Sequence, residues 1–450
     1  MRREPTVRTL LPVLIALALL PGAPIRAQQT AQDSLRAEVR RLSELVDSLR
    51  REVERLRAAG QEADADDALA RLRAAAAAAA GGEQAAAAEP EPQEFVGRQR
   101  SLQALNPEIS LTGDVFASLD PDDTDRDNYY PREFELSIVS NLDPFSRAKV
   151  FVSRHEEGGE LAPFGHADEE AGGEDAHGGG FAVEEGYVEW VGLPGGLGLK
   201  LGRFYQQFGQ LNRWHSHALP FQGRSLPHLA FIGEEPLAQT GASVRWLAPF
   251  GGGAGTYEAT VDLTTSSNES LFGESGRPSV LANLNGFWQL SEATDLDLAL
   301  SWVNGSHEDS VARVDRDLYG AEMSFTWRPP SASRYRGFNL RAGAMLLDGL
   351  VLAEEPGVGE EATHALGFWS MAELRLDRSW LVGGRFDWTE NPAHPDETAW
   401  LAGPTLTWWQ SEYVRIRAEY DLLGQADLDN RGRFYLQVTF AMGPHKHETY

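Results

Sequence analysis

The segment ISLTGDVFASL, residues 109–119, alternates apolar and polar side chains over its whole length. In an extended chain, Ile109, Leu111 and Val115 point to one side and Ser110 and Asp114 to the other, because successive side chains of a strand face opposite ways. The same period of two recurs along the chain up to residues 434–442, FYLQVTFAM. The pattern predicts β-strands throughout residues 107–442.

The length and aromatic content of these segments indicate a membrane. Each matches the roughly nine to eleven residues that a tilted strand needs to cross a bilayer, whereas strands of a water-soluble sandwich are usually shorter. Several tryptophans share the apolar parity, where an indole would face lipid: Trp190, Trp246, Trp288, Trp302, Trp327, Trp388, Trp400 and Trp408. We therefore predict an all-β fold, a 16-stranded antiparallel transmembrane β-barrel preceded by a short α-helical coiled coil.

The connections between the predicted strands alternate between long and short. Long connections such as residues 120–130 and 203–237 are interleaved with tight turns such as 143–145 and 193–195. Bacterial outer-membrane barrels have an even strand number, long external loops and short periplasmic turns, so both ends of the barrel are expected on the periplasmic side. The approximate strand starts are Pro107, Pro131, Ser146, Phe181, Gly196, Ala238, Gly255, Ser279, Thr294, Arg316, Tyr335, Ala365, Trp380, Glu397, Tyr413 and Arg431.

The composition restricts function and location. The 450-residue chain carries a formal charge of -27, which argues against a nucleic-acid partner, because phosphate contacts need clustered Lys and Arg. It has no cysteine, so disulfides, thiolate zinc sites and cysteine nucleophiles are excluded. Arg2, Arg3 and Arg8 precede an apolar run at residues 10–20 and the small residue Ala27, the pattern of a cleaved secretory signal. We predict the cell outer membrane as the location, because only a closed barrel satisfies strand backbones in lipid.

The sequence before and after the predicted barrel divides into several segments. We assign residues 1–27 to a signal peptide, 28–58 to a periplasmic coiled coil, 59–104 to a linker rich in Ala, Glu and Pro, 105–443 to the barrel and 444–450 to a periplasmic tail. A single amphipathic helix is the alternative to the coiled coil. The coiled coil rests on a heptad seam of Leu35, Val39, Leu42, Val46, Leu49, Val53 and Leu56.

The strand pattern, with its longest connection in the third external position, resembles the trimeric general porins and the phosphate-selective porin O/P group. The resemblance is architectural and covers about residues 105–443. It implies a trimer in outer-membrane lipid and lipopolysaccharide, and a third loop that folds into the lumen and narrows the pore. The Val and Leu heptad favours two chains, which conflicts with a trimer. A coiled coil ahead of the barrel is similar to porins that tether the envelope, which implies contact with the cell wall.

Charged residues on the polar parity are candidates for the pore lining. A 16-stranded barrel is wide enough to leave an aqueous channel in which such charges stay hydrated. They either form opposed rows that set selectivity or are paired wall charges without strong selectivity, and the excess of acid favours cations or neutral solutes. The candidates in the third long connection are Arg203, Tyr205, Arg213, Arg224, Glu234 and Glu235; those on strands are Lys149, Lys200, Arg245, Arg341, Arg375, Arg385, Arg415, Arg417, Glu133, Glu135, Glu185, Glu189 and Glu373. Glu184 is the main charged residue on the outward parity.

Histidines and carboxylates in the long connections are candidate metal ligands. His215 and His217 are two residues apart and could share a metal in an extended segment. His155, His166 and His177 belong to a Gly-rich acidic connection that could hold zinc or calcium loosely. Hydrogen-bonded histidines and a solvated acidic loop are the alternatives. Residues 123–127 resemble the start of a calcium loop, but the residues that follow exclude an EF-hand.

Enzyme motifs are lacking from the sequence. It contains no Gly-x-Ser-x-Gly, phosphate loop or His-Glu-x-x-His, so we do not expect an enzyme. The first hypothesis is an outer-membrane channel for passive diffusion of small hydrophilic solutes or ions. The alternatives are an envelope-tethering protein anchored by its barrel, and a divalent-metal uptake channel that uses the acidic and His-rich external loops.

Overall fold

The structure is a computed structural model, and its second compact unit contains every described residue. The chain divides into Met1–Ser101 and Leu102–Tyr450. The predicted signal peptide, coiled coil, linker and C-terminal tail lie outside the described residues. Within the described part, no helix is long and apolar enough to cross a membrane. The described residues are 107–123, 127–156, 158–165, 180–249, 255–273, 275–308, 313–351, 362–394, 396–426 and 428–443.

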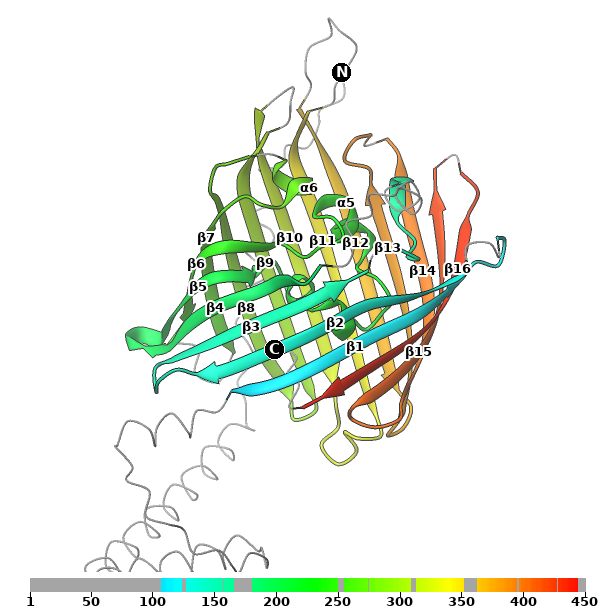
Figure 1. Cartoon of the computed structure of the whole chain (residues 1–450), viewed down its shortest axis with the longest axis horizontal. Coiled ribbons are helices and arrows are strands. Elements are labelled where there is room, and N and C mark those ends of the chain that lie inside the picture. Colours follow the sequence, from blue (N-terminus) through cyan, green and yellow to red (C-terminus); the bar gives the residue numbers. More distant parts are fainter. Residues whose placement is uncertain are drawn as a thin grey trace, which may run out of the picture. The chain divides into compact units, whose positions relative to one another are not determined.

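Sixteen antiparallel strands close into a barrel (Figure 1). Each strand pairs with its neighbours in sequence, and β1 closes the barrel on β16, with Val115 opposite Val438. Every strand begins within three residues of its predicted start, so the predicted fold of the barrel is confirmed. The strands are β1 (Glu108–Leu119), β2 (Asn128–Asn141), β3 (Ser146–His155), β4 (Ala182–Leu193), β5 (Leu197–Tyr205), β6 (Ala238–Leu247), β7 (Thr256–Thr264), β8 (Ser279–Ser291), β9 (Thr294–Glu308), β10 (Arg313–Trp327), β11 (Gly337–Val351), β12 (Ala362–Arg375), β13 (Trp380–Glu390), β14 (Thr398–Trp409), β15 (Val414–Gln425) and β16 (Arg431–Met442).

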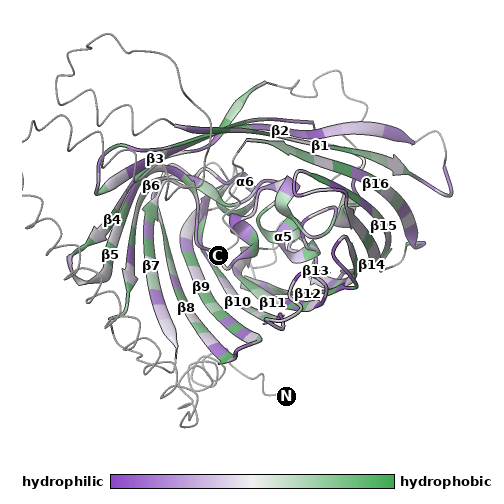
Figure 2. Cartoon of the chain, turned by 90° about the horizontal axis from the view of Figure 1, so that it is seen from below, coloured by the Kyte–Doolittle hydropathy of each residue, from purple (hydrophilic) through white to green (hydrophobic). Residues whose placement is uncertain are grey.

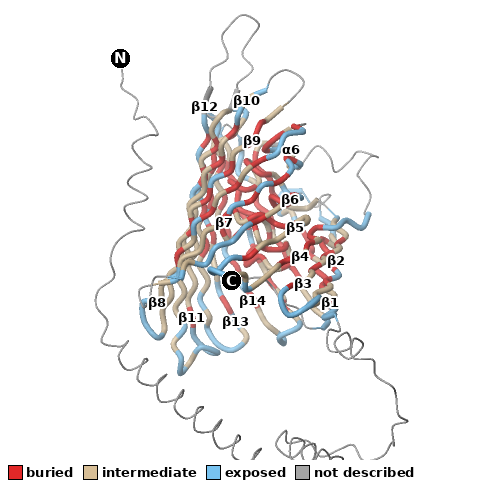
Figure 3. The backbone as a smooth tube through the Cα atoms, turned by 90° about the vertical axis from the view of Figure 1, so that its left-hand side faces the viewer, coloured by how far each residue is buried: buried red, intermediate tan, exposed pale blue. Residues whose placement is uncertain are grey.

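The alternation in the sequence separates the two faces of the wall. Apolar side chains on the outward face stay exposed, with Val261 at 52% and Leu284 at 60%, whereas Ser110 and Thr112 on the inward face are buried. Figure 3 shows buried and exposed positions alternating along the strands. An apolar outward face is what the hydrocarbon of a bilayer requires of a barrel.

Three connections on the long-loop side contribute to the barrel interior, and we call them L2 (residues 156–181), L3 (206–237) and L4 (265–278). L3 contains η5 (Leu211–Arg213), η6 (Ser216–Ala218) and α5 (Leu226–Phe231), L4 contains α6 (Glu269–Phe272), and the described part of L2 contains η3 (Pro163–Gly165). On the opposite rim, η4 (Pro194–Gly196) forms the tight turn between β4 and β5. In Figure 2, α5 and α6 lie within the ring of strands.

Apolar side chains from these connections pack against the inner wall and form buried clusters inside the barrel. In the largest cluster, Phe231 of α5 and Phe272 of α6 join inward-facing residues of β8 to β12, including Leu318. A second cluster joins Trp214 and other residues of L3 to β12. A third joins L2 and α5 to β14 and β15. The core of this protein is therefore enclosed by the barrel wall.

Candidate functional site

L3 crosses the lumen from the β5–β6 side to the far wall. The backbone amides of the loop reach strands that are distant in sequence, and all of the acceptors are inward-facing side chains. These hydrogen bonds run from Gly209 N to Ser301 Oγ of β9 (2.9 Å), from Gln222 N to Glu419 Oε2 of β15 (2.8 Å) and from Leu226 N to Asp387 Oδ2 of β13 (3.2 Å). The loop therefore lies inside the barrel and contacts opposite sides of its wall.

Arginines of the wall hold L3 in place by donating to its carbonyl oxygens. Hydrogen bonds to charged groups contribute about 1.5–3 kcal/mol each, so several of them fix a loop strongly. Arg224 of L3 adds an internal brace to Leu211 O and Trp214 O. The wall contacts are Arg132 Nη2 to Ser216 O (3.0 Å), Arg385 Nη1 to Gly223 O (3.1 Å), Arg415 Nη2 to His217 O (2.6 Å) and Arg417 Nη2 to Leu219 O (2.7 Å). Of the predicted pore arginines, Arg224, Arg385, Arg415 and Arg417 thus bind loop backbone.

A polar cavity lies between L3 and the inner face of β3 to β7. Its charges are paired along the wall: Arg147 lies 2.6 Å from Glu189, and Arg245 lies 3.7 Å from both Glu189 and Glu258. Lys200 lies 4.4 Å from the centre of the Tyr187 ring. The charged side chains that line the cavity are Arg147, Glu189, Lys200, Arg213, Arg245, Glu258 and Asp262.

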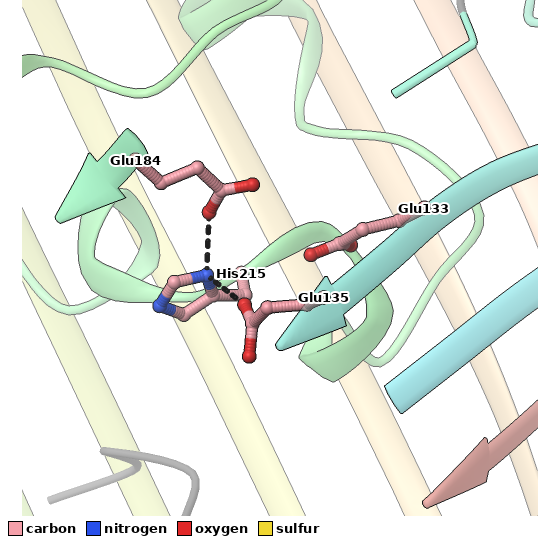
Figure 4. A group of neighbouring side chains, drawn as sticks. All are labelled: Glu133, Glu135, Glu184 and His215. Atoms are coloured by element: carbon pink, nitrogen blue, oxygen red, sulfur yellow. Dashed lines mark hydrogen bonds and ion pairs between the residues drawn. The ribbon is translucent and has the colours of Figure 1, made fainter. Parts of the chain in front are cut away.

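A second polar group lies beside this cavity, where carboxylates of β2 and β4 surround His215 of L3 (Figure 4). His215 Nδ1 lies 2.7 Å from Glu135 Oε2 and 2.8 Å from Glu184 Oε2. His217 Nδ1 lies 2.9 Å from Glu133 Oε1. One ligand atom from each of Glu133, Glu135, Glu184 and His215 can be chosen so that all four lie within 4.8 Å of one another. We call these four residues the carboxylate–histidine cluster.

Further groups orient this cluster from its edges. Tyr205 Oη donates to Glu184 Oε2 over 2.5 Å, and His155 Nε2 contacts the other oxygen of Glu184. Glu185 accepts from the backbone of Tyr205 at 2.8 Å and lies 3.6 Å from His215 Nε2. Tyr205 also lines the polar cavity, so the cavity extends to the edge of the cluster.

Burial and nearby charge set the protonation of the L3 histidines. Burial alone lowers the pKa of His215, but the carboxylates of Glu135, Glu184 and Glu185 outweigh it and hold the pKa well above 6.5. Burial and Arg224 together lower the pKa of His228 to about 3. His215 and His228, two of the three histidines of L3, therefore differ in charge at neutral pH.

Other predicted site residues lie apart from these two groups. Arg203 is not part of L3, because it lies in β5, as Tyr205 does, and it shares the face of the exposed Leu201. Glu234 and Glu235 are exposed at the end of L3. His166 and His177 lie outside the described residues.

The remaining wall candidates line the inner face singly or in pairs. Lys149 is buried over the Tyr187 ring, and Arg341 lies between the Trp214 ring and Glu373. Arg375 lies near the short turn that follows β12, where it contacts the backbone of Arg378.

Two β-bulges explain why the alternation of apolar and polar residues did not identify Glu184 and Arg132 as inward-facing. Glu184 was predicted to face outward, but the register between β3 and β4 shifts at Phe151 and Val152, and the bulge turns the Glu184 side chain inward, where it is 6% exposed. Arg132 lies at a similar shift between β1 and β2 and pairs with the buried Asp114. A bulge adds one residue to one strand and reverses the parity beyond it, and neither segment shows this in its sequence.

The closed 16-stranded antiparallel barrel is the fold of the Gram-negative outer-membrane porins. The structure is similar to OprB of Pseudomonas putida, with a TM-score of 0.51 and 13% identity over 77% of this chain and 96% of that one. It is also similar to an anion-selective porin from Comamonas acidovorans, with a TM-score of 0.51 and 10% identity over 75% of this chain and 100% of that one. At such identities the likeness concerns the fold.

Sequence comparison gives little beyond the fold. No family model matches the chain. An uncharacterized protein of Aquifex aeolicus (strain VF5) is 43% identical over 70 residues, which are 16% of this chain and 15% of that protein. The chain thus matches less than a sixth of the length of its curated relative.

Proposed function

We propose that this chain is an outer-membrane channel for passive diffusion of small hydrophilic solutes, with a path along the polar cavity between L3 and β3 to β7. The observation that supports this proposal most is the asymmetric position of L3. The loop packs tightly against β8 to β15 through apolar clusters, and it faces charged side chains across the cavity on the other side. Charges in a water-filled path stay hydrated and set the field that ions cross.

The charge of the cavity favours anions weakly, in contrast to the preference that the composition predicted. Four basic side chains, Arg147, Lys200, Arg213 and Arg245, line the cavity with three acidic ones. Much of the acidic excess lies elsewhere, since carboxylates such as Glu133 and Glu419 are buried against L3. The proposed path therefore carries a small net positive charge.

Planar-bilayer recordings test the proposal. We expect stepwise ohmic currents from the mature chain. In a KCl gradient, the reversal potential should be shifted from zero toward the equilibrium potential of chloride. Arg245→Gln should move the reversal potential toward the equilibrium potential of potassium, because it removes a positive charge from a cavity-lining side chain that is 45% exposed. Arg378→Gln, in the turn at residues 376–379, removes the same charge outside the path and should leave selectivity unchanged. A folded barrel that carries no current at any voltage contradicts the proposal.

A further inference from the structure

We propose that Glu133, Glu135, Glu184 and His215 bind one divalent transition-metal ion of the zinc type per chain. The proposal goes beyond the channel function and does not depend on it. It rests on the convergence of these four side chains from three elements, β2, β4 and L3, on one point inside the barrel (Figure 4).

The backbone accounts for this convergence. Glu133 and Glu135 are two residues apart in β2, so both point inward. Glu184 joins them because of the bulge in β4, and His215 is delivered by the docking of η6 against this part of the wall. The docking of L3 therefore brings His215 to the three carboxylates.

The carboxylate of Glu135 is the independent sign that a ligand belongs here. Glu135 is 1% exposed, its Oε1 has no hydrogen-bond partner among the described residues, and its Oε2 is paired with His215 Nδ1 at 2.7 Å. The same Nδ1 also lies 2.8 Å from Glu184 Oε2, and one N–H cannot serve two carboxylates well. A buried carboxylate oxygen without a donor is costly, and a divalent cation would satisfy it together with its neighbours.

The donor set selects the class of metal. One imidazole nitrogen and three carboxylate oxygens suit zinc, which takes four nitrogen or oxygen ligands at about 2.0–2.2 Å. Calcium and magnesium prefer oxygen ligands alone, and thiolate-selecting metals find no sulfur here.

Outer-shell contacts of the kind that metal sites use are already present. His217 Nδ1 and the His217 backbone N–H, each 2.9 Å away, contact the two oxygens of Glu133, while Tyr205 donates to Glu184. Such contacts orient ligating carboxylates and tune affinity. Because Tyr205 also lines the polar cavity, an ion entering there reaches the site at its edge.

Zinc titration of the detergent-solubilised mature chain, against a chromophoric chelator, tests the proposal. We expect one tight site per chain in the wild type. Glu135→Gln and His215→Gln should each weaken it by more than the roughly 10- to 100-fold that loss of an outer-shell partner costs. Glu322→Gln is the matched control, because Glu322 is a partly buried wall carboxylate that accepts from the L3 backbone outside the cluster. His166→Gln combined with His177→Gln should retain the site, which separates it from binding by L2.

Two further measurements keep the result decisive. Heat-modified mobility on gels shows whether each variant forms the barrel. X-ray absorption of the zinc-loaded wild type reports the ligands without any substitution, and we expect one imidazole with oxygen donors. Absence of a saturable site in the wild type, unchanged affinity in both folded ligand variants, or a shell with two or more imidazoles each overturns the proposal. None of these outcomes depends on conductance.

Discussion

Substitution of Phe231 by alanine should release L3 from the wall without unfolding the barrel. Phe231 of α5 is 1% exposed and packs in the largest interior cluster with inward-facing residues of β8 to β12. Removal of a fully buried phenylalanine ring costs about 3–5 kcal/mol. The strands remain paired through their own backbone hydrogen bonds, so we expect this cost to fall on the docking of the loop. Since about 1.4 kcal/mol corresponds to a factor of ten, the undocked population should rise by roughly 10²- to 4 × 10³-fold.

Hydrogen exchange measured by mass spectrometry is the assay. The amides of Leu229 and Ile232 donate within α5, at 3.1 and 2.9 Å, and should exchange faster by that factor, because local opening limits their exchange. Peptides from β9 and β10 should keep their protection. Phe386→Ala is the matched control, because Phe386 faces outward and is 41% exposed. Equal loss of protection in L3 and in the strands would refute the reasoning, since the loop would then not open independently of the wall.

Two further predictions concern pH and assembly. The pKa of His228 is lowered to about 3 in the docked loop, so below about pH 6.5 the undocked loop takes up a proton that the docked loop does not. Docking should therefore weaken by up to about tenfold per pH unit as pH falls from 6.5 to 4. His228→Asn should flatten this pH dependence in hydrogen exchange corrected for intrinsic rates, and an unchanged slope contradicts the prediction. Sedimentation in detergent should give the mass of three mature chains, and deletion of residues 28–58 should leave the barrel folded; a two-chain mass would favour the dimer that the heptad pattern indicates.

The wall was predictable from the sequence because its signal is local. A residue in a strand reveals its face through its neighbours two positions away, and Val115 and Asp114 do so without any knowledge of their partners. Bilayer thickness then limits strand length, which is why the starts of all sixteen strands could be placed within three residues.

The site was less predictable because it depends on register and on distant contacts. The sequence placed Glu133, Glu135 and His215 correctly among polar residues, but not next to one another. Their proximity requires the docked position of L3, which is decided by strands up to about 200 residues away, as in the hydrogen bond from Gln222 to Glu419. Glu184 joins them only through a bulge. A period of two cannot reveal either effect.

One signal for the docked loop was nevertheless present in the sequence. Val303, Leu318 and Leu401 interrupt the polar parity of their strands near the long-loop rim, and all are at most 1% exposed. An inward apolar side chain in a water-filled barrel would face water, at a cost of about 1.5–3 kcal/mol each. Several such residues on neighbouring strands therefore require an apolar cover, and only a loop that folds back from the same rim can supply it. By this argument the apolar positions on the polar parity predict which wall L3 packs against, and the polar inner faces of β6 and β7 predict where the open path remains.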